Sequence, residues 1–219
     1  MIDVYVAGSD GMWFGVAHVG EKIVTTVFSS NKDRAVEILL KNLPLNVNYR
    51  IMEKGSEFAQ RTIFALKEAH LGEHAFGDFA LSEEFVEKAV ARVLKVAANI
   101  PIGYVASYGG IAKITGSTPR MVGRVMASNP LYPIVPCHRV VGADFSLVGY
   151  GGRKTPYALK AKLARLTAES KGFKSEKDIA IDGAKLRVFP VERVIRTAKE
   201  HGTTLSANKG HTLASYQSF

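Results

Sequence analysis

Residues 100–141 read IPIGYVASYGGIAKITGSTPRMVGRVMASNPLYPIVPCHRVV, and the middle of this stretch decides the fold that we expect. Residues 108–116 have the pattern of a short helix that ends at a glycine, and residues 120–129 have that of a second helix. Two short helices joined by a tight turn predict a helix-turn-helix. Because many helix pairs of this kind bind nothing, plain packing is the alternative.

The start of the second helix is well marked. Pro119 suits a first helical turn, and either Ser117 or Thr118 can cap it. Arg120 and Arg124 follow at the end of the helix that usually meets DNA in such motifs. These residues favour contact with nucleic acid over packing alone.

The only cysteine of the chain, Cys137, lies in the apolar run IVPCHRVV (134–141). A thiol reacts as its thiolate and needs a base or a cation beside it, and His138 and Arg139 follow directly. Neighbouring side chains of a strand point to opposite faces, so contact between the thiol and His138 requires a turn, which Pro136 permits. Two interpretations remain: a reactive thiol, or a buried structural cysteine in an apolar strand.

The net charge of +9 is unevenly distributed. Residues 1–100 carry 11 Lys+Arg against 13 Asp+Glu, residues 101–169 carry 9 against 2, and residues 170–219 carry 9 against 5. A positive surplus around the thiol would attract a polyanion to that region. An ordinary basic surface is the alternative.

The chain of 219 residues, with 47% apolar and 22% charged residues, predicts a globular protein of one large or two small domains. No stretch approaches the roughly 20 apolar residues that a bilayer span needs, and no signal-peptide pattern opens the chain. One cysteine allows neither an internal disulfide nor a thiolate zinc cluster, which favours a reducing compartment. We therefore expect a cytoplasmic protein without a membrane partner or a metal site.

We expect three domains: an N-terminal α/β domain (1–78), a mostly helical domain (79–170) that holds the helix-turn-helix candidate for DNA binding, and an extension of unknown role (171–219). The first domain should hold an antiparallel meander and two helices, and the boundary should lie at about residues 77–82. Helices are also expected from Ser82 to residue 100 and over 155–169. In the extension we expect a strand pair (179–189), a helix (191–201) and a mobile end (203–219).

The motif PCHRVV (136–141), preceded by NP (129–130) and by IPIGYVASYGGIA (100–112), resembles the O6-alkylguanine-DNA alkyltransferase family, also named methylated-DNA-protein-cysteine methyltransferases. The resemblance covers roughly residues 80–170 in motif detail. It implies an α/β (α+β) fold with a ribonuclease-H-like antiparallel sheet and helices in the N-terminal domain. The C-terminal domain would be mostly helical, with a helix-turn-helix and the PCHR motif in its active site.

The resemblance also implies the reaction. Cys137 would take the alkyl (methyl) group from O6-alkylguanine in DNA, with O4-alkylthymine as a further substrate, in one irreversible displacement. No cofactor is implied, because the lesion is itself the alkyl donor. The partner would be double-stranded DNA carrying the lesion, bound by a monomer, with cooperative binding along DNA as an alternative.

By the same resemblance, His138 would be the base that removes the thiol proton through a water. Asn129 would buttress the active-site turn, and Tyr108 would help to rotate the nucleotide and protonate the leaving guanine. Glu169 would orient the histidine, because KLARLTAE (162–169) matches the family's spacing of a lysine, six residues and a glutamate. The match requires extra residues within 150–161, and a register that starts from Lys160 would put Thr167 there instead.

DNA contact would come from the second helix in the minor groove, with the target base extruded from the stack. Arg120 would fill the gap that the base leaves, Gly123 would allow close approach, and Arg124 and Thr118 complete the expected contacts. The expected pocket wall consists of Val140, Tyr132, Tyr150 and Gly151. Tyr132 occupies a position where relatives often have a small residue or proline.

Three rival functions fit the sequence less well. A protein that only flags the lesion would replace the acceptor cysteine, commonly by tryptophan. A transcriptional regulator would need polar base-reading side chains, and residues 121–126 offer few beyond Arg124. A cysteine hydrolase would need an oxyanion hole, for which the sequence has no independent signature.

Overall fold

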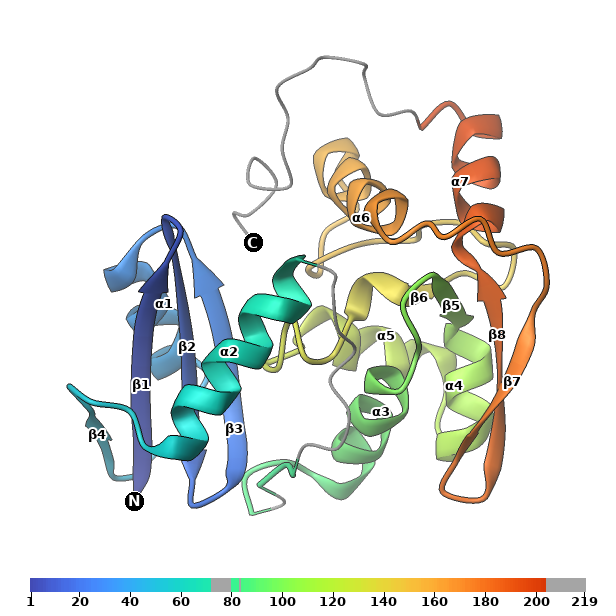
Figure 1. The fold of residues 1–219 in the computed structure, drawn as a ribbon. Helices are drawn as coiled ribbons and strands as arrows, with labels where there is room; N and C mark the ends of the chain where they lie inside the picture. The colour runs from blue at the N-terminus through green and yellow to red at the C-terminus, as the bar shows by residue number, and fades with distance from the viewer. Residues whose placement is uncertain (72–79, 83, 204–219) are drawn as a thin grey trace. The chain divides into compact units, whose positions relative to one another are not determined.

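The computed structural model describes residues 1–71, 80–82 and 84–203, and the chain forms two compact units (Figure 1). Unit 1 comprises residues 1–91 and 130–135, and unit 2 comprises residues 92–129 and 136–219. Both contain helices and a four-stranded sheet, which confirms the predicted α/β class. In the described part of the chain, no helix is long and apolar enough to cross a membrane. The predicted mobile end, apart from Thr203, lies outside the described residues.

The sheet of unit 1 has the strand order β3-β2-β1-β4. Its first three strands form the predicted antiparallel meander, whereas β4 pairs in parallel with β1 and was not predicted, because three exposed residues carry no periodic signal. The bounds in unit 1 are β1 (Ile2–Ser9), β2 (Met12–Val19), β3 (Lys22–Ser29), α1 (Lys32–Lys41), β4 (Tyr49–Ile51) and α2 (Glu57–Leu71). One apolar core joins the sheet to α1 through Val4, Ala17 and Leu39.

The helix predicted from Ser82 begins later, so this prediction was wrong at its N-terminal end. The helix α3 spans Lys88–Ala98. Residues 80–82 instead pair with the start of β3: the Ile23 N–H donates to Ala80 O, and the Ser82 N–H donates to Ile23 O. These backbone bonds at the sheet edge replace the helical bonds that the capping pattern suggested.

Residues 130–135 return the chain to unit 1. The Thr26 N–H and the Thr25 hydroxyl both donate to Pro130 O, at 2.9 and 2.6 Å. The Tyr132 ring packs against Phe28 at a centroid distance of 5.4 Å. The segment directly before Pro136 is thus tied to the meander.

The sheet of unit 2 has the order β6-β5-β8-β7. The central strand β5 pairs in parallel with β6, and in antiparallel fashion with β8 from the tail. Its strands are β5 (Tyr104–Ser107), β6 (Val140–Val141), β7 (Lys177–Ile181) and β8 (Ala184–Pro190). Pairing of β5 with β6 brings the residues just before Tyr108 alongside those just after Arg139.

The tail contains the strand pair and the helix that the sequence predicts, and both belong to the core of unit 2. Helix α7 (Val191–Glu200) follows β8 directly. Val191 and Val194 share a buried apolar cluster with Val105 of β5, Val141 of β6 and Leu166. Helix α7 therefore helps to hold β5 and β6, the strand that follows the PCHR motif.

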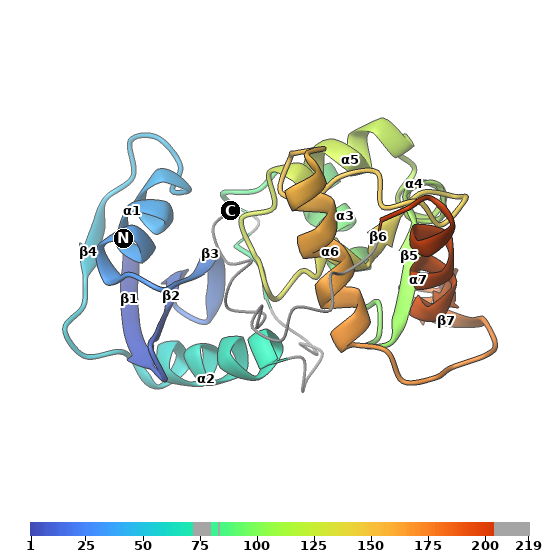
Figure 2. The same cartoon turned by 90° about the horizontal axis from the view of Figure 1, so that it is seen from above.

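Three further helices of unit 2 carry the candidate site: α4 (Tyr108–Thr115), α5 (Pro119–Ala127) and α6 (Pro156–Ala168). Helices α4 and α5 pack against each other (Figure 2). Gly116 ends α4 in a left-handed conformation with φ 65°, which glycine adopts without strain. The cap of α5 is Thr118, whose hydroxyl accepts from the Met121 N–H at 3.2 Å. This decides between the two capping candidates.

Candidate active site

Cys137 opens a 3₁₀ turn, Cys137–Arg139, that leads into β6. The Arg139 N–H closes the turn by donating to Pro136 O at 2.8 Å. This is the turn that contact between adjacent cysteine and histidine side chains requires. Cys137 and His138 are both buried, with exposed fractions of 8% and 4%.

Glu169 joins His138 and Arg139 in one buried network. Its Oε1 lies 2.7 Å from His138 Nε2, and the Arg139 guanidinium donates to both carboxylate oxygens at 2.8 Å. Arg139 also donates to Ile100 O at 2.7 Å. A bidentate arginine-carboxylate pair of this kind is among the stronger charge-assisted contacts. The carboxylate is thereby held in one orientation toward the imidazole.

The electrostatics of this network favour a neutral histidine beside a charged glutamate. Burial lowers the pKa of His138, and Glu169 only partly opposes this shift. Burial alone would raise the pKa of Glu169, but the charges and hydrogen bonds of His138 and Arg139 lower it overall. A neutral imidazole that donates from Nε2 to the carboxylate keeps its lone pair on Nδ1.

The position of Glu169 follows from the register of α6. It is the C-cap of that helix and is buried, whereas Thr167 is exposed. Of the two registers left open by the sequence, the structure therefore brings Glu169 to His138.

Lys162 is fully buried on α6. From the sequence it served only as the lysine of the lysine-to-glutamate spacing. Its ammonium donates to three backbone carbonyls, Val140 O at 2.6 Å, Leu147 O at 2.9 Å and Gly149 O at 3.0 Å. Burial lowers the pKa of Lys162 to about 8, and the Cys137 charge opposes this shift. The sequence contained one signal of this burial: Lys162 lies on the apolar face of its helix, because its i−4 and i+4 neighbours, Ala158 and Leu166, are both apolar.

Burial raises the pKa of the Cys137 thiol. Lys162, a hydrogen bond from the Asn129 side chain and Arg165 act in the opposite direction without cancelling the effect. The thiol is therefore protonated at neutral pH and needs a base before it can react. Asn129 reaches it from the segment that follows α5.

Tyr108 is the first residue of α4, and Ser107 caps this helix by accepting from the Gly110 N–H at 2.9 Å. Burial, together with the Cys137 charge, raises the pKa of Tyr108 to about 12. The Lys162 ammonium lies 5.9 Å from the centroid of its ring. The phenol therefore keeps its proton at neutral pH.

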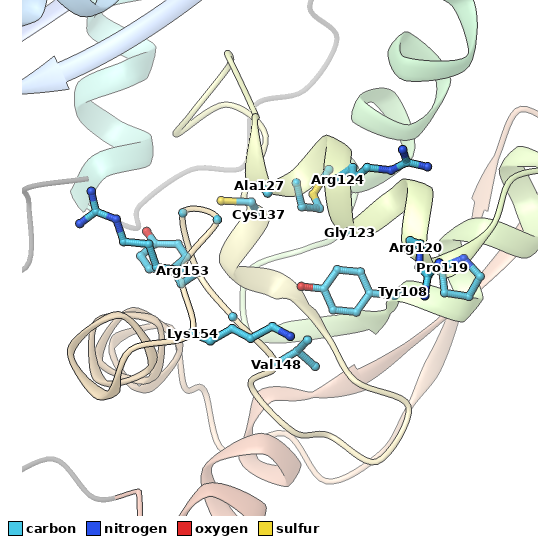
Figure 3. Close-up of a pocket in the computed structure, with 15 residues that line it drawn as sticks. Tyr108, Pro119, Arg120, Gly123, Arg124, Ala127, Cys137, Val148, Arg153 and Lys154 are labelled. Atoms are coloured by element: carbon cyan, nitrogen blue, oxygen red, sulfur yellow. The ribbon is translucent and has the colours of Figure 1, made fainter.

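Two of the residues described above border a pocket of about 530 Å³ within unit 2 (Figure 3). One wall is α5, and the other is the segment from Val148 to Lys154. Cys137 and Tyr108 line the pocket between these walls. Gly123 leaves room beside Tyr108, since a Cβ atom there would lie 4.0 Å from the ring.

Some of the other predicted site residues line the pocket, and two others, Val140 and Tyr132, are not among its lining residues. Arg120, Arg124, Tyr150 and Gly151 line the pocket, and Thr118 adjoins its edge as the cap of α5. Val140 is buried, with its carbonyl engaged by Lys162, and Tyr132 packs in unit 1 against Phe28. The described residues contain no group of three or more His, Cys, Asp or Glu side chains suited to a metal. We did not predict from the sequence that Arg139 and Lys162 make these buried contacts, or that Val148, Arg153 and Lys154 line the pocket.

A family model described as 6-O-methylguanine DNA methyltransferase, DNA binding domain, matches residues 88–171. The methylated-DNA-protein-cysteine methyltransferase of Pyrobaculum aerophilum is 58% identical over 54 residues, which are 25% of this chain and 36% of that protein. The protein of the same name from Mycobacterium leprae is 44% identical over 80 residues, which are 36% of this chain and 46% of the relative. The matched stretches thus span less than half the length of these curated relatives.

Two solved structures from Mycobacterium tuberculosis cover more of the chain. Its O6-methylguanine methyltransferase has a TM-score of 0.54 and 25% identity over 80% of this chain and 96% of that chain. The OGT protein, crystallised in complex with DNA, has a TM-score of 0.54 and 26% identity over 76% and 92%. These matches confirm the resemblance to the O6-alkylguanine-DNA alkyltransferase family that the PCHRVV, NP and IPIGYVASYGGIA motifs carry, and the family model locates it at residues 88–171.

Proposed function

We propose that the protein repairs alkylated DNA by transferring the alkyl group of O6-alkylguanine to the Cys137 thiol, once per molecule. The observation that carries this proposal is a single thiol lining a pocket, next to a buried His138–Glu169 pair. The names of the curated relatives and the DNA complex of the Mycobacterium tuberculosis protein support it.

The first step is loss of the thiol proton. Because burial raises the pKa of Cys137, a base must act, and neutral His138 would take the proton at Nδ1 through a bridging water. Glu169 then stabilises the imidazolium, and Arg139 keeps that carboxylate charged. The nearby Lys162 and Arg165 favour the thiolate electrostatically.

The second step is an in-line displacement. The sulfur forms a bond to the alkyl carbon, the bond from that carbon to guanine O6 breaks, and the electron pair stays with the purine. The departing base gains a proton from Tyr108, whose phenol is protonated at neutral pH. The thioether that forms has no built-in route for release, so each molecule acts once.

The lesion must leave the base stack to reach a buried thiol. The α5 wall would enter the minor groove, with Arg120 in the gap of the extruded base, Gly123 giving close approach, and Arg124 and Thr118 beside the backbone. The surplus of positive charge over residues 101–169 fits a DNA partner. We extend the proposal to O4-alkylthymine as a second substrate, to a monomer that can bind DNA cooperatively, and to the cytoplasm as its location.

Mass spectrometry of the intact protein tests the reaction, after incubation with a duplex that contains one O6-methylguanine. We expect one added methyl group, mapped to Cys137 and saturating at one per protein. Cys137→Ala should gain no mass yet still bind the duplex. Repeated turnover would indicate a cysteine hydrolase, and binding without mass gain would indicate a protein that only flags the lesion.

A further inference from the structure

The pocket wall opposite α5 carries two cations, Arg153 and Lys154, that the proposed reaction does not use. In the view of Figure 3, Arg153 lies on the other side of Cys137 from Arg120 and Arg124, and Lys154 extends toward Val148. All four basic residues are exposed and line the same pocket. The described residues that line it include no aspartate or glutamate. A pocket with this lining suits a ligand that carries negative charge on both of its sides.

Arg153 is held in place by a tight hairpin. The backbones of Tyr150 and Arg153 exchange two hydrogen bonds, at 2.9 and 3.0 Å. The two residues between them, Gly151 and Gly152, have φ values of 54° and 72°, as a type I′ turn requires. Lys154 follows directly, and Thr155 then caps α6 by accepting from the Ala158 N–H at 3.3 Å. The two cations thus lie between a closed hairpin and a capped helix start.

The same hairpin adjoins the end of α5. A Cβ atom on Gly152 would lie 3.7 Å from both Cβ and O of Ala127, which is ordinary contact. The two pocket walls therefore approach each other at this point. Arg153 and Lys154 are consequently placed at a defined position relative to Arg120 and Arg124, which lie on the preceding turns of the same helix.

The sequence gives a second reason to consider these residues. The alkyltransferase pattern between the PCHR motif and Lys162 can be matched only if residues 150–161 contain extra positions. Arg153 and Lys154 lie within this longer segment. This segment thus brings positive charge to the pocket.

We propose that Arg153 and Lys154 bind the backbone phosphates next to the extruded nucleotide, on the side opposite the α5 arginines. This inference rests on the proposed function. Extrusion swings a sugar and its two flanking phosphates toward the pocket, and cations on one wall alone would leave one phosphate without a partner. Arginine can hold a phosphate bidentately and lysine acts as a compact point charge, so the pair suits this ligand.

The test compares Arg153→Gln/Lys154→Gln with a control that loses the same charge, Lys171→Gln/Lys174→Gln. Both control lysines are exposed and follow the far end of α6, a helix of 13 residues, about 20 Å from its start. The first measurement is the affinity of Cys137→Ala forms for a duplex with one O6-methylguanine, at several salt concentrations. Each lost phosphate contact should reduce the slope of log affinity against log salt by about 1, so the pocket variant should lose about 2.

The second measurement is the rate of mass gain in single turnover, on the same duplex and on free O6-benzylguanine, which has no phosphate. We expect the pocket variant to lose about tenfold more rate on the duplex than on the free base, and the control to show no such difference. Equal losses on both substrates, or a salt slope equal to that of the control, would overturn the assignment. If the wild-type protein gains no alkyl group from either substrate, the proposed function fails. The salt slope still decides whether these two residues contact phosphate.

Discussion

Nε2 of His138 lies 2.7 Å from Oε1 of Glu169. Both side chains are buried, although the two residues are 31 positions apart in the chain. Nε and Nη2 of Arg139 donate to the two oxygens of the same carboxylate. The histidine is therefore oriented by a group that is itself oriented, as the relay between a thiol and its base requires. The predictions below follow from this network and from the pocket beside it.

Glu169→Gln removes the charge of the network while keeping its size. We expect the single-turnover rate with O6-benzylguanine to fall about 100-fold, because the imidazolium loses its stabilising partner. Unfolding in urea should become easier by about 3 kcal/mol, since Arg139 is left buried without its counter-charge. Glu200→Gln, at an exposed position of α7, is the matched control and should change neither value. A wild-type rate in Glu169→Gln would contradict the relay.

Tyr108→Phe removes the phenolic hydroxyl and keeps the aromatic ring beside Lys162. The phenol, whose pKa is raised to about 12, is protonated at neutral pH and so has a proton to donate to the leaving guanine; its loss should slow transfer about 100-fold. The measurement is the rate of mass gain on duplex and on free base, and both should fall together. Tyr49→Phe, exposed on β4, serves as the control. A change in DNA affinity without a change in the rate on free base would assign Tyr108 to positioning alone.

Lys162 links stability to pH with a definite sign. Its pKa is about 8 in the folded protein and near the ordinary lysine value of 10.5 when unfolded, so the unfolded chain binds more protons between these values. Stability relative to Lys162→Met should therefore rise with pH from about 8 to 10.5, by about 3 kcal/mol in total. Urea unfolding in a Cys137→Ser background measures this effect without the opposing titration of the thiol. A difference that stays constant or falls over this range would refute the assignment.

Arg120→Ala should separate duplex repair from thiol chemistry. The side chain lines the pocket from α5 and would fill the gap that the extruded base leaves. We expect about a tenfold slower reaction with duplex O6-methylguanine and a smaller loss with free O6-benzylguanine, because only the duplex needs the gap filled. Arg61→Ala in unit 1 provides a control of equal charge. Equal losses on both substrates would count against the finger role.

Local signals in the sequence predicted much of the site scaffold. The hydroxyl of Thr118, Pro119 and Gly116 mark the ends of α4 and α5, since caps and positive φ values depend on a few adjacent residues. Pro136 permitted the turn at Cys137 for the same reason. The tail strands and α7 were also visible, as alternation and helical spacing. The start of α3 was not, because Ser82 pairs with β3, nearly 60 residues earlier in the chain.

The sequence by itself identified the candidate residues for the chemistry: one thiol, a histidine next to it, and a tyrosine at a helix start. Only the tertiary structure decided how they act together. Lys162 is buried because carbonyls of three residues, at positions 140, 147 and 149, converge on its ammonium. Arg153 and Lys154 line the same pocket as the α5 arginines, and the glycine hairpin beside them adjoins Ala127. Such contacts join segments far apart in the chain, and their geometry depends on packing rather than on local propensity.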